Sequence, residues 1–196
     1  MSRSRPTQRC AAPLNATRPH RTPSAAAMMG FDIQPLGPHH DRAGFSCGEA
    51  SLDDFLKTKA RKEQALNLSV PFVASPKDLP AVIAGYYTLS ALSIEVTAIP
   101  AEVRKKFPRY PLVPATLLGR LARATDFAAA RLGEWLLLDA LHRAQRAAET
   151  VGSYAVVVDP LNAAATAFYA RYGFLRFGEG SRQYLPMATI EELGLG

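Results

Sequence analysis

The stretch formed by residues 154–174 constrains the possible fold more than any other part of the chain. It opens with the apolar run YAVVVDP and continues, after one residue, with NAAATAFYARYGF. A short apolar run of this kind is typical of a strand buried inside a sheet. The segment that follows predicts a helix over 166–172, which Gly173 ends and which carries Tyr169 one turn before Tyr172.

A second stretch, residues 117–141, reads LLGRLARATDFAAARLGEWLLLDAL and predicts a strand, a tight turn and a long helix. The first N–H groups of a helix lack partners inside that helix, and the helix dipole adds positive potential at the same end. A strand that enters a helix through a tight turn can therefore hold a phosphate group. Together, the two stretches indicate a cofactor site with Tyr169 as an acid beside it.

The rest of the pattern indicates a mixed sheet with helices around it. Ser51 is expected to begin a helix, because Ser51 and Asp54 have the spacing of a capping box. Residues 108–114 are expected to form a proline-punctuated loop. Strands are expected at 31–36, 70–75, 81–89, 93–96, 115–122, 154–159, 174–177 and 183–187, and further helices at 100–107 and 132–150. The predicted fold class is therefore α/β or α+β, with helices that alternate with strands late in the chain.

Length and composition limit the alternatives. The chain has 196 residues, of which 48% are hydrophobic, so we expect one domain with a real core. No apolar run reaches the roughly 18–20 residues of a membrane span, so no membrane partner is expected. The two cysteines, Cys10 and Cys47, lie far apart without the spacing of metal ligands. We therefore predict no metal site and a reduced, cytoplasmic setting.

The net charge of +6 arises mainly from the first 28 residues, which hold five arginines and no acid. The rest of the chain has 18 basic and 17 acidic side chains, a net charge of +1. We predict that residues 1–28 form a disordered basic tail and that residues 29–196 form the domain. Three explanations of the tail stay open: a start codon placed too far upstream, with Met28 or Met29 as the true start, a basic arm that touches RNA or a partner, and a transit peptide.

The strand–turn–helix and strand–helix–strand units, in this order and spacing, resemble the GNAT acetyltransferase superfamily. In that superfamily the turn holds the pyrophosphate of acetyl-CoA, and its pattern is Gln or Arg, two variable residues, Gly, one variable residue, then Gly or Ala. The aligned residues here are Ala128, Ala129, Ala130, Arg131, Leu132 and Gly133. Only Gly133 matches. Arg131 replaces the first glycine, so it lacks that residue's backbone freedom but could add a positive charge beside the pyrophosphate.

The same resemblance implies roles for other residues. The pantetheine arm of acetyl-CoA would lie along the strand that contains Leu121, Ala122 and Arg123. Tyr169 would protonate the sulfur of the departing coenzyme A. Asn162 and Phe168 complete the predicted cofactor-binding set. In the superfamily, the residue at the position of Asn162 often forms a hydrogen bond with the cofactor arm. The alternative is that Phe168, Tyr169 and Tyr172 only pack the helix against the sheet.

A general base is not evident, because no Glu or His lies on the strand at 115–122. Deprotonation of the substrate amine could pass through water, or the amine could already have a low pKa. The second option favours the α-amino group of an aminoacyl ester over a lysine side chain.

A narrower resemblance covers residues 45–186 and is to the acetyltransferase toxins of bacterial toxin–antitoxin pairs. The blocks that carry it are FSCGEASLDDFL, IAGYYTLSALSI, FPRYPLVPATLLGRLA, LGEWLLLDALHRA and AFYARYGF. This resemblance implies an N-acetyltransferase that uses acetyl-CoA to acetylate the amino group of aminoacyl-tRNA and so blocks translation. It also implies a ribbon-helix-helix antitoxin as partner and a homodimer as a possible assembly.

Local clusters of basic residues agree with an RNA substrate. The predicted substrate-binding residues are Arg104, Lys105, Lys106, Arg109 and Arg120. A second cluster, Lys57, Lys59, Arg61 and Lys62, lies on the first predicted helix. Each cluster could contact phosphates or could be a solvated helix face. Two other functions stay open: acetylation of a small amine or a protein amino group, and a GNAT-like binding module without catalysis.

Overall fold

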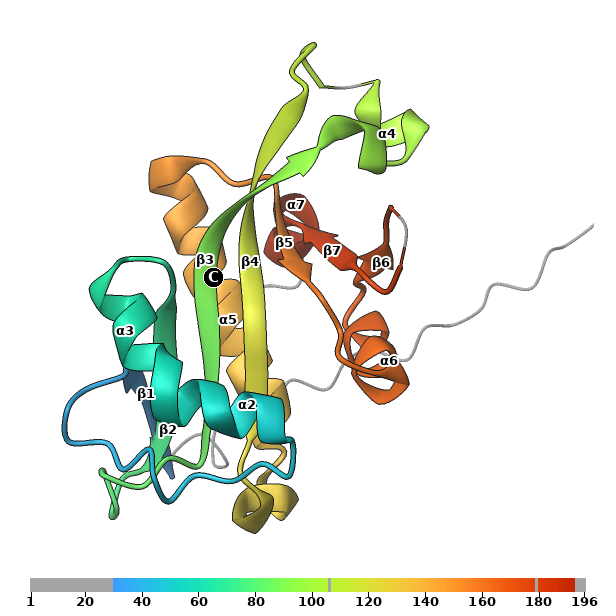
Figure 1. Ribbon diagram of the computed structural model, residues 1–196. Helices are drawn as coiled ribbons and strands as arrows, with labels where there is room; N and C mark the ends of the chain where they lie inside the picture. Colours follow the sequence, from blue (N-terminus) through green and yellow to red (C-terminus); the bar gives the residue numbers. More distant parts are fainter. Residues whose placement is uncertain (1–29, 106, 179, 193–196) are drawn as a thin grey trace, which may run out of the picture.

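The computed structural model describes residues 30–105, 107–178 and 180–192 of the chain. The predictions for the tail, residues 1–28, and for Lys106 lie outside these residues. The described part forms a seven-stranded sheet in the order β1-β2-β3-β4-β5-β7-β6 (Figure 1). The strands are β1 (Phe31–Pro35), β2 (Val70–Pro76), β3 (Gly85–Glu95), β4 (Leu112–Arg123), β5 (Ala155–Val158), β6 (Leu175–Arg176) and β7 (Gln183–Pro186).

The sheet is mixed and mostly antiparallel, which confirms the predicted fold class. Only the pair β4–β5 is parallel, and every other neighbouring pair is antiparallel. The helices are α2 (Ala50–Asp54), η1 (Phe55–Lys59), α3 (Ala60–Ala65), η2 (Val96–Ala98), α4 (Ala101–Arg104), η3 (Thr125–Ala130), α5 (Leu132–Val151), α6 (Ala163–Arg171) and α7 (Met187–Glu192).

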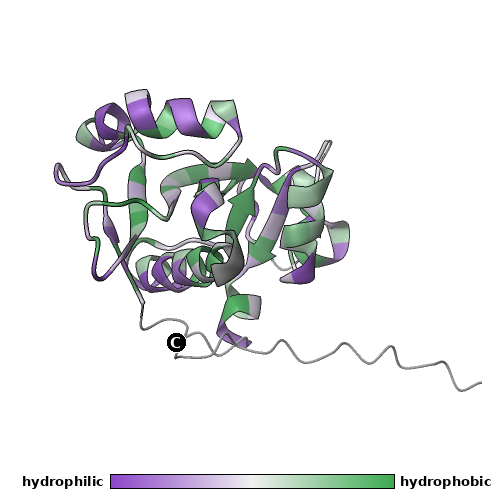
Figure 2. Cartoon of the chain, turned by 90° about the horizontal axis from the view of Figure 1, so that it is seen from below, coloured by the Kyte–Doolittle hydropathy of each residue, from purple (hydrophilic) through white to green (hydrophobic). Residues whose placement is uncertain are grey.

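Helices cover both faces of the sheet. Val73 and Tyr86 pack in one apolar cluster with α2, η1 and α3, whereas their neighbours Ala74 and Tyr87 pack in another cluster with α5. Successive strand residues point to opposite faces, so this alternation assigns one face to the segment α2–η1–α3 and the other to α5. In Figure 2 the largely hydrophobic strands lie between helices that carry hydrophilic residues.

A third apolar cluster joins the ends of β3 and β4, next to the connection between these two strands, to β5 and β7. Ile94, Val113 and Tyr184 are buried there, and Phe107 packs against them from the connection between β3 and β4. This connection carries η2 and α4 and forms an arm that folds back over the sheet. The arm also holds Arg104, Lys105 and Arg109, three of the basic residues predicted to contact RNA.

Three expectations about local structure were wrong. The strands predicted at 81–89 and 93–96 merge into one strand, β3, because residues 90–92 continue the pairing with β4, and residues 81–84 lie before this strand. Part of the predicted loop at 108–114 belongs to β4, which begins at Leu112. Ser51 does not cap its helix. The helix begins at Ala50, and Asp53 rather than Asp54 accepts a hydrogen bond from a preceding backbone N–H, that of Cys47, at 2.8 Å.

Candidate active site

The strands β4 and β5 separate part of the way along β4. They pair only at residues 116–118 of β4 and 156–158 of β5, whereas β4 continues to Arg123. Figure 1 shows the two strands diverging toward α6. Within the described residues, the segment 119–123 therefore pairs with β3 on one side and with no strand on the other. Its free backbone groups can form hydrogen bonds with an extended ligand, as they would with an additional strand.

A β-bulge at Gly119 lies where the split begins. Thr88 of β3 pairs with Arg120, and Leu89 pairs with Leu118, so Gly119 has no partner in the ladder. An extra residue of this kind bends its strand and increases the local twist. Leu121, Ala122 and Arg123, predicted to bind pantetheine, all lie on β4 beyond this bulge.

The turn that follows β4 leads to the start of α5. It runs through η3 and Arg131 before α5 begins at Leu132, and no side chain caps the first N–H groups of α5. Leu132 is buried in the core. A Cβ on Gly133 would meet no other part of the protein within 4 Å apart from its own neighbours in the chain and helix, so the space beside this residue is open. An uncapped helix start with open space beside its second residue suits a phosphate group.

Arg131 has a left-handed backbone conformation, which glycine adopts at little cost. Its φ and ψ of 49° and 22° lie in the left-handed region, which is uncommon for residues other than glycine. Ala128 is exposed at the same turn, and the backbone of Ala129 and Ala130 lies within η3. The turn is therefore built without the expected glycine, at a cost in backbone strain.

The start of α5 is tied to the end of α6. Arg131 forms an ion pair with Glu134 at 2.5 Å. Burial and a hydrogen bond to the Glu134 carboxylate raise the pKa of Tyr172 to about 12. Part of the positive charge of Arg131 is thus balanced by Glu134, which the sequence analysis did not single out. The helix start and the aromatic end of α6 border the same region.

Tyr169 is the buried residue of α6 and belongs to the same apolar cluster as Leu118 and Val158, which pair where the split begins. Asn162 caps this helix, since its Oδ1 accepts a hydrogen bond from the N–H of Ala165 at 2.9 Å. Tyr169 is only 7% exposed, and its ring packs 5.3 Å from the rings of Phe168 and Phe174. Burial raises the pKa of the Tyr169 phenol above its ordinary value of 10.0, at which a phenol is already protonated at neutral pH. A neutral phenol can donate a proton to an anion that forms beside it.

The arm presents the basic residues that the sequence predicts to bind substrate. Arg104, Lys105 and Arg109 are exposed there, and Lys105 forms an ion pair with Glu102 at 2.9 Å. Arg104 and Arg109 have no ion pair with any residue that the structure describes. Their charges are therefore free to attract a polyanion.

Arg120 occupies a different environment, under the segment α2–η1–α3. Its guanidinium lies 3.5 Å from the centroid of the Phe55 ring and 4.0 Å from a carboxylate oxygen of Glu63. Arg120 is thus held by its own chain rather than beside the residues of the arm. The prediction that it contacts substrate stays a prediction.

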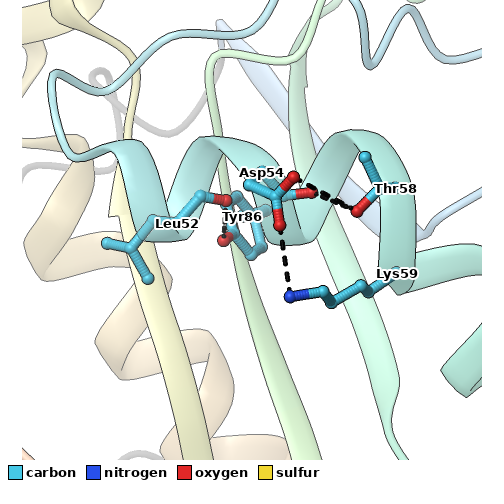
Figure 3. A network of polar contacts seen from close by, with 5 residues as sticks. All are labelled: Leu52, Asp54, Thr58, Lys59 and Tyr86. Carbon is cyan, nitrogen blue, oxygen red and sulfur yellow. Dashed lines mark hydrogen bonds and ion pairs between the residues drawn. The ribbon is translucent and has the colours of Figure 1, made fainter.

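The second basic cluster is partly engaged in contacts within its helix. Lys59 lies 3.2 Å from Asp54, whose backbone carbonyl accepts a hydrogen bond from Thr58 (Figure 3). The hydroxyl of Tyr86 reaches from β3 and donates to the carbonyl of Leu52 at 2.8 Å. This bond fixes the helical segment above the strand that pairs with β4.

The described residues support neither a metal site nor a membrane-spanning helix. No group of three or more His, Cys, Asp or Glu side chains among them could hold a metal ion. None of the helices in the described ranges combines the length and apolar character needed to cross a bilayer.

The chain is similar to curated proteins over most of its length, although no protein-family model matches it. The probable toxin TacT of Sinorhizobium fredii (strain NBRC 101917 / NGR234) is 33% identical over 171 residues, which are 82% of this chain and 93% of that protein. The tRNA-acetylating toxin of Mycobacterium tuberculosis (strain ATCC 25618 / H37Rv) is 35% identical over 148 residues, 75% of this chain and 86% of that toxin.

Solved structures give the same result. A tyrosine-to-phenylalanine mutant of KacT superposes with a TM-score of 0.79 at 30% identity, over 84% of this chain and 99% of that one. AtaT in complex with acetyl-methionyl-tRNAfMet superposes with a TM-score of 0.78 at 28% identity, over 84% of this chain and 99% of the AtaT chain. AtaTR bound with AcCoA has a TM-score of 0.75 at 27% identity, over 85% of this chain and 99% of the matched chain.

Proposed function

Because the chain belongs to the GNAT-type acetyltransferase toxins of bacterial toxin–antitoxin systems, we propose that it transfers acetyl from acetyl-CoA to the amino group of aminoacyl-tRNA. The modified aminoacyl group could no longer serve as an ordinary amine nucleophile, so translation would stop. The observation that carries this proposal is the split between β4 and β5. The free edge of β4 beyond it leads through η3 to the uncapped start of α5, and the buried Tyr169 packs in the same apolar cluster as Leu118 and Val158.

Each part of the site has a role in this reaction. The N–H groups at the start of α5, around Gly133, would hold the pyrophosphate of acetyl-CoA, and the free edge of β4 at residues 121–123 would bond its pantetheine arm. Acetyl-CoA supplies the acetyl thioester. The phenol of Tyr169 would give its proton to the departing sulfur, which lowers the charge that develops in the transition state.

Asn162 and Phe168 have supporting roles in the proposal. Asn162 fixes the first turn of α6, and Phe168 packs against Tyr169, so both hold the proposed acid in place. The arm residues Arg104, Lys105 and Arg109 would contact phosphates of the tRNA. Arg120 would act only after it leaves the ring of Phe55.

The partners are proposed on the same basis. Solved neighbours include AtaT bound to the C-terminus of the antitoxin AtaR and a KacTA–DNA complex. We expect a ribbon-helix-helix antitoxin for this chain, a homodimer as its assembly and the cytoplasm as its location, where charged tRNA is found.

The test is a cell-free translation reaction with purified protein, with and without acetyl-CoA. The wild-type protein is expected to block synthesis only when acetyl-CoA is present, and mass spectrometry should find acetylated amino acids on tRNA. Tyr169→Phe should retain binding of coenzyme A but lower the acetylation rate by about 100-fold or more. Tyr172→Phe is the matched control and should stay inhibitory.

Two outcomes would contradict the proposal. Full inhibition by Tyr169→Phe would show that another group protonates the sulfur. Turnover of acetyl-CoA without any acetylated aminoacyl-tRNA would assign the enzyme to a different amine.

A further inference from the structure

A polar pocket opens between the arm and the loop that joins β6 to β7. It has a volume of about 560 Å³, and its lining includes Ser93, Glu95, Asp159, Phe177, Ser181 and Arg182. Gly178 lies beside the arm, since a Cβ added to it would be 3.9 Å from the Cβ of Ala98. The pocket is thus built by segments far apart in the sequence that the fold brings together.

The pocket adjoins the split between β4 and β5. Val158, the last residue of β5, pairs with Leu118, the β4 residue directly before the bulge. Asp159 follows Val158, so the wall of the pocket begins where the two strands separate. The end of the pocket at Asp159 therefore adjoins the free edge of β4, whereas Glu95 pairs with Leu112, seven residues before Gly119 on β4.

The charged groups of the pocket are two carboxylates and one guanidinium, which give a net charge of −1. Arg182 binds Asp159 through two hydrogen bonds, at 2.6 and 2.7 Å, and this pair forms a fixed wall. Glu95 is exposed and accepts a hydrogen bond from Thr97 at 3.2 Å. Within the described ranges Glu95 has no ion pair, so its carboxylate can bind a cation that enters the pocket.

The surroundings of the pocket have the opposite charge. Arg104 and Arg109 lie on the arm that continues from Ala98, and both are exposed without a described acidic partner. A ligand that fits this arrangement carries phosphates along its length and an ammonium group at its end. Aminoacyl-tRNA has this chemistry at its 3′ end, whereas deacylated tRNA and N-acetylated aminoacyl-tRNA lack the terminal positive charge.

We infer that this pocket binds the α-ammonium group of the aminoacyl ester, with Glu95 as the residue that recognises it. The inference rests on the proposed function. Acetylation turns the ammonium into a neutral amide, which removes its attraction to the carboxylate. The pocket therefore distinguishes the substrate from the product of the reaction, and this difference favours release of the acetylated tRNA.

The experiment compares the affinity of the protein for three forms of one tRNA in the absence of acetyl-CoA. Methionyl-tRNA, N-acetyl-methionyl-tRNA and the deacylated tRNA serve as probes, since the ammonium is common to all aminoacyl-tRNAs. The wild-type protein is expected to bind methionyl-tRNA about 3- to 10-fold more tightly than the other two forms. Glu95→Gln should remove this preference, and Glu95→Asp, which keeps the charge, should retain part of it.

Glu149→Gln is the matched control, because Glu149 is exposed on α5 and does not line the pocket. It should leave the preference unchanged. Equal affinity of the wild-type protein for all three forms would overturn the inference, as would a full preference in Glu95→Gln. Acetylation of aminoacyl-tRNA, measured in parallel with acetyl-CoA, distinguishes failure of the pocket inference from failure of the proposed function. Acetylation without a preference for methionyl-tRNA would refute only the pocket inference. Absence of acetylation would refute the proposed function.

Discussion

The guanidinium of Arg131 lies 2.5 Å from the carboxylate of Glu134, across the first turn of α5. Arg131 holds this position with a left-handed backbone, at φ 49°. Two opposing effects thus meet at the proposed pyrophosphate site. The backbone is strained where glycine would be relaxed, and the arginine side chain is held by an acid that would lie beside the phosphates.

Replacement of Arg131 separates these two effects. Arg131→Gly and Arg131→Ala both remove the guanidinium, but only glycine relaxes the left-handed backbone. We expect Arg131→Gly to have a free energy of unfolding about 1 kcal/mol higher than that of Arg131→Ala, as measured in urea. We also expect Arg131→Gly to bind coenzyme A more tightly than Arg131→Ala in calorimetry, because glycine admits the phosphates closer to the backbone. Equal stability of the two variants would show that no strain is stored at this turn.

The burial of Tyr169 predicts a loss of stability at high pH. Its pKa is raised above the ordinary value of 10.0, so the folded state binds this proton more tightly than the unfolded state. The resulting stabilisation is complete below pH 10 and is lost as the pH rises above it, by about 1.4 kcal/mol per pH unit. Tyr169→Phe lacks this group, and its free energy of unfolding should fall less steeply between pH 10 and pH 11.

The control for this experiment is Tyr110→Phe, because Tyr110 is 66% exposed. Its pH profile should follow that of the wild-type protein. Identical slopes for Tyr169→Phe and the wild-type protein would mean that the phenol is already accessible to hydroxide in the folded state.

The helix with Tyr169 and the turn before α5 could be predicted from the sequence, because both depend on local signals. An apolar run, a glycine after the helix and the aromatic spacing all lie within a few residues of one another. The split between β4 and β5 is different in kind. It depends on which residues pair across the sheet, and a bulge at Gly119 leaves no mark in the periodicity of a single strand.

Contacts between distant segments were missed for the same reason. Asp139 and Arg143 have the spacing of an ordinary helical ion pair, and they do pair at 2.8 Å. The sequence could not show that Tyr87, 52 residues away, donates a hydrogen bond to Asp139. Nor could it show that Asp159 and Arg182 meet beside the split, since the two residues are 23 positions apart.

The contacts of Asp139 predict a large effect on stability. Its carboxylate accepts hydrogen bonds from Tyr87 and Arg143, and Arg143 also donates to the carbonyl of Ile33 at 3.2 Å. These bonds join α5 to β3 and β1. Asp139→Ala leaves both donors without their acceptor, so we expect it to lower the free energy of unfolding by about 2–3 kcal/mol. Glu149→Ala, an exposed acid on the same helix, should cost less than about 0.5 kcal/mol. Similar urea midpoints for the two variants would contradict a stabilising role for this network.

Asn162 offers a test of two roles at one position, since it caps α6 and is also predicted to bond the cofactor arm. Asn162→Ala removes the acceptor for the N–H of Ala165 and should cost about 1 kcal/mol of stability. Asn162→Ser keeps a capping oxygen but loses the amide, so it should restore most of that stability. If Asn162 also binds the cofactor, Asn162→Ser should still bind coenzyme A more weakly than the wild-type protein in calorimetry. Wild-type affinity in this variant would restrict Asn162 to its structural role, and weak affinity with full stability would place its amide at the cofactor.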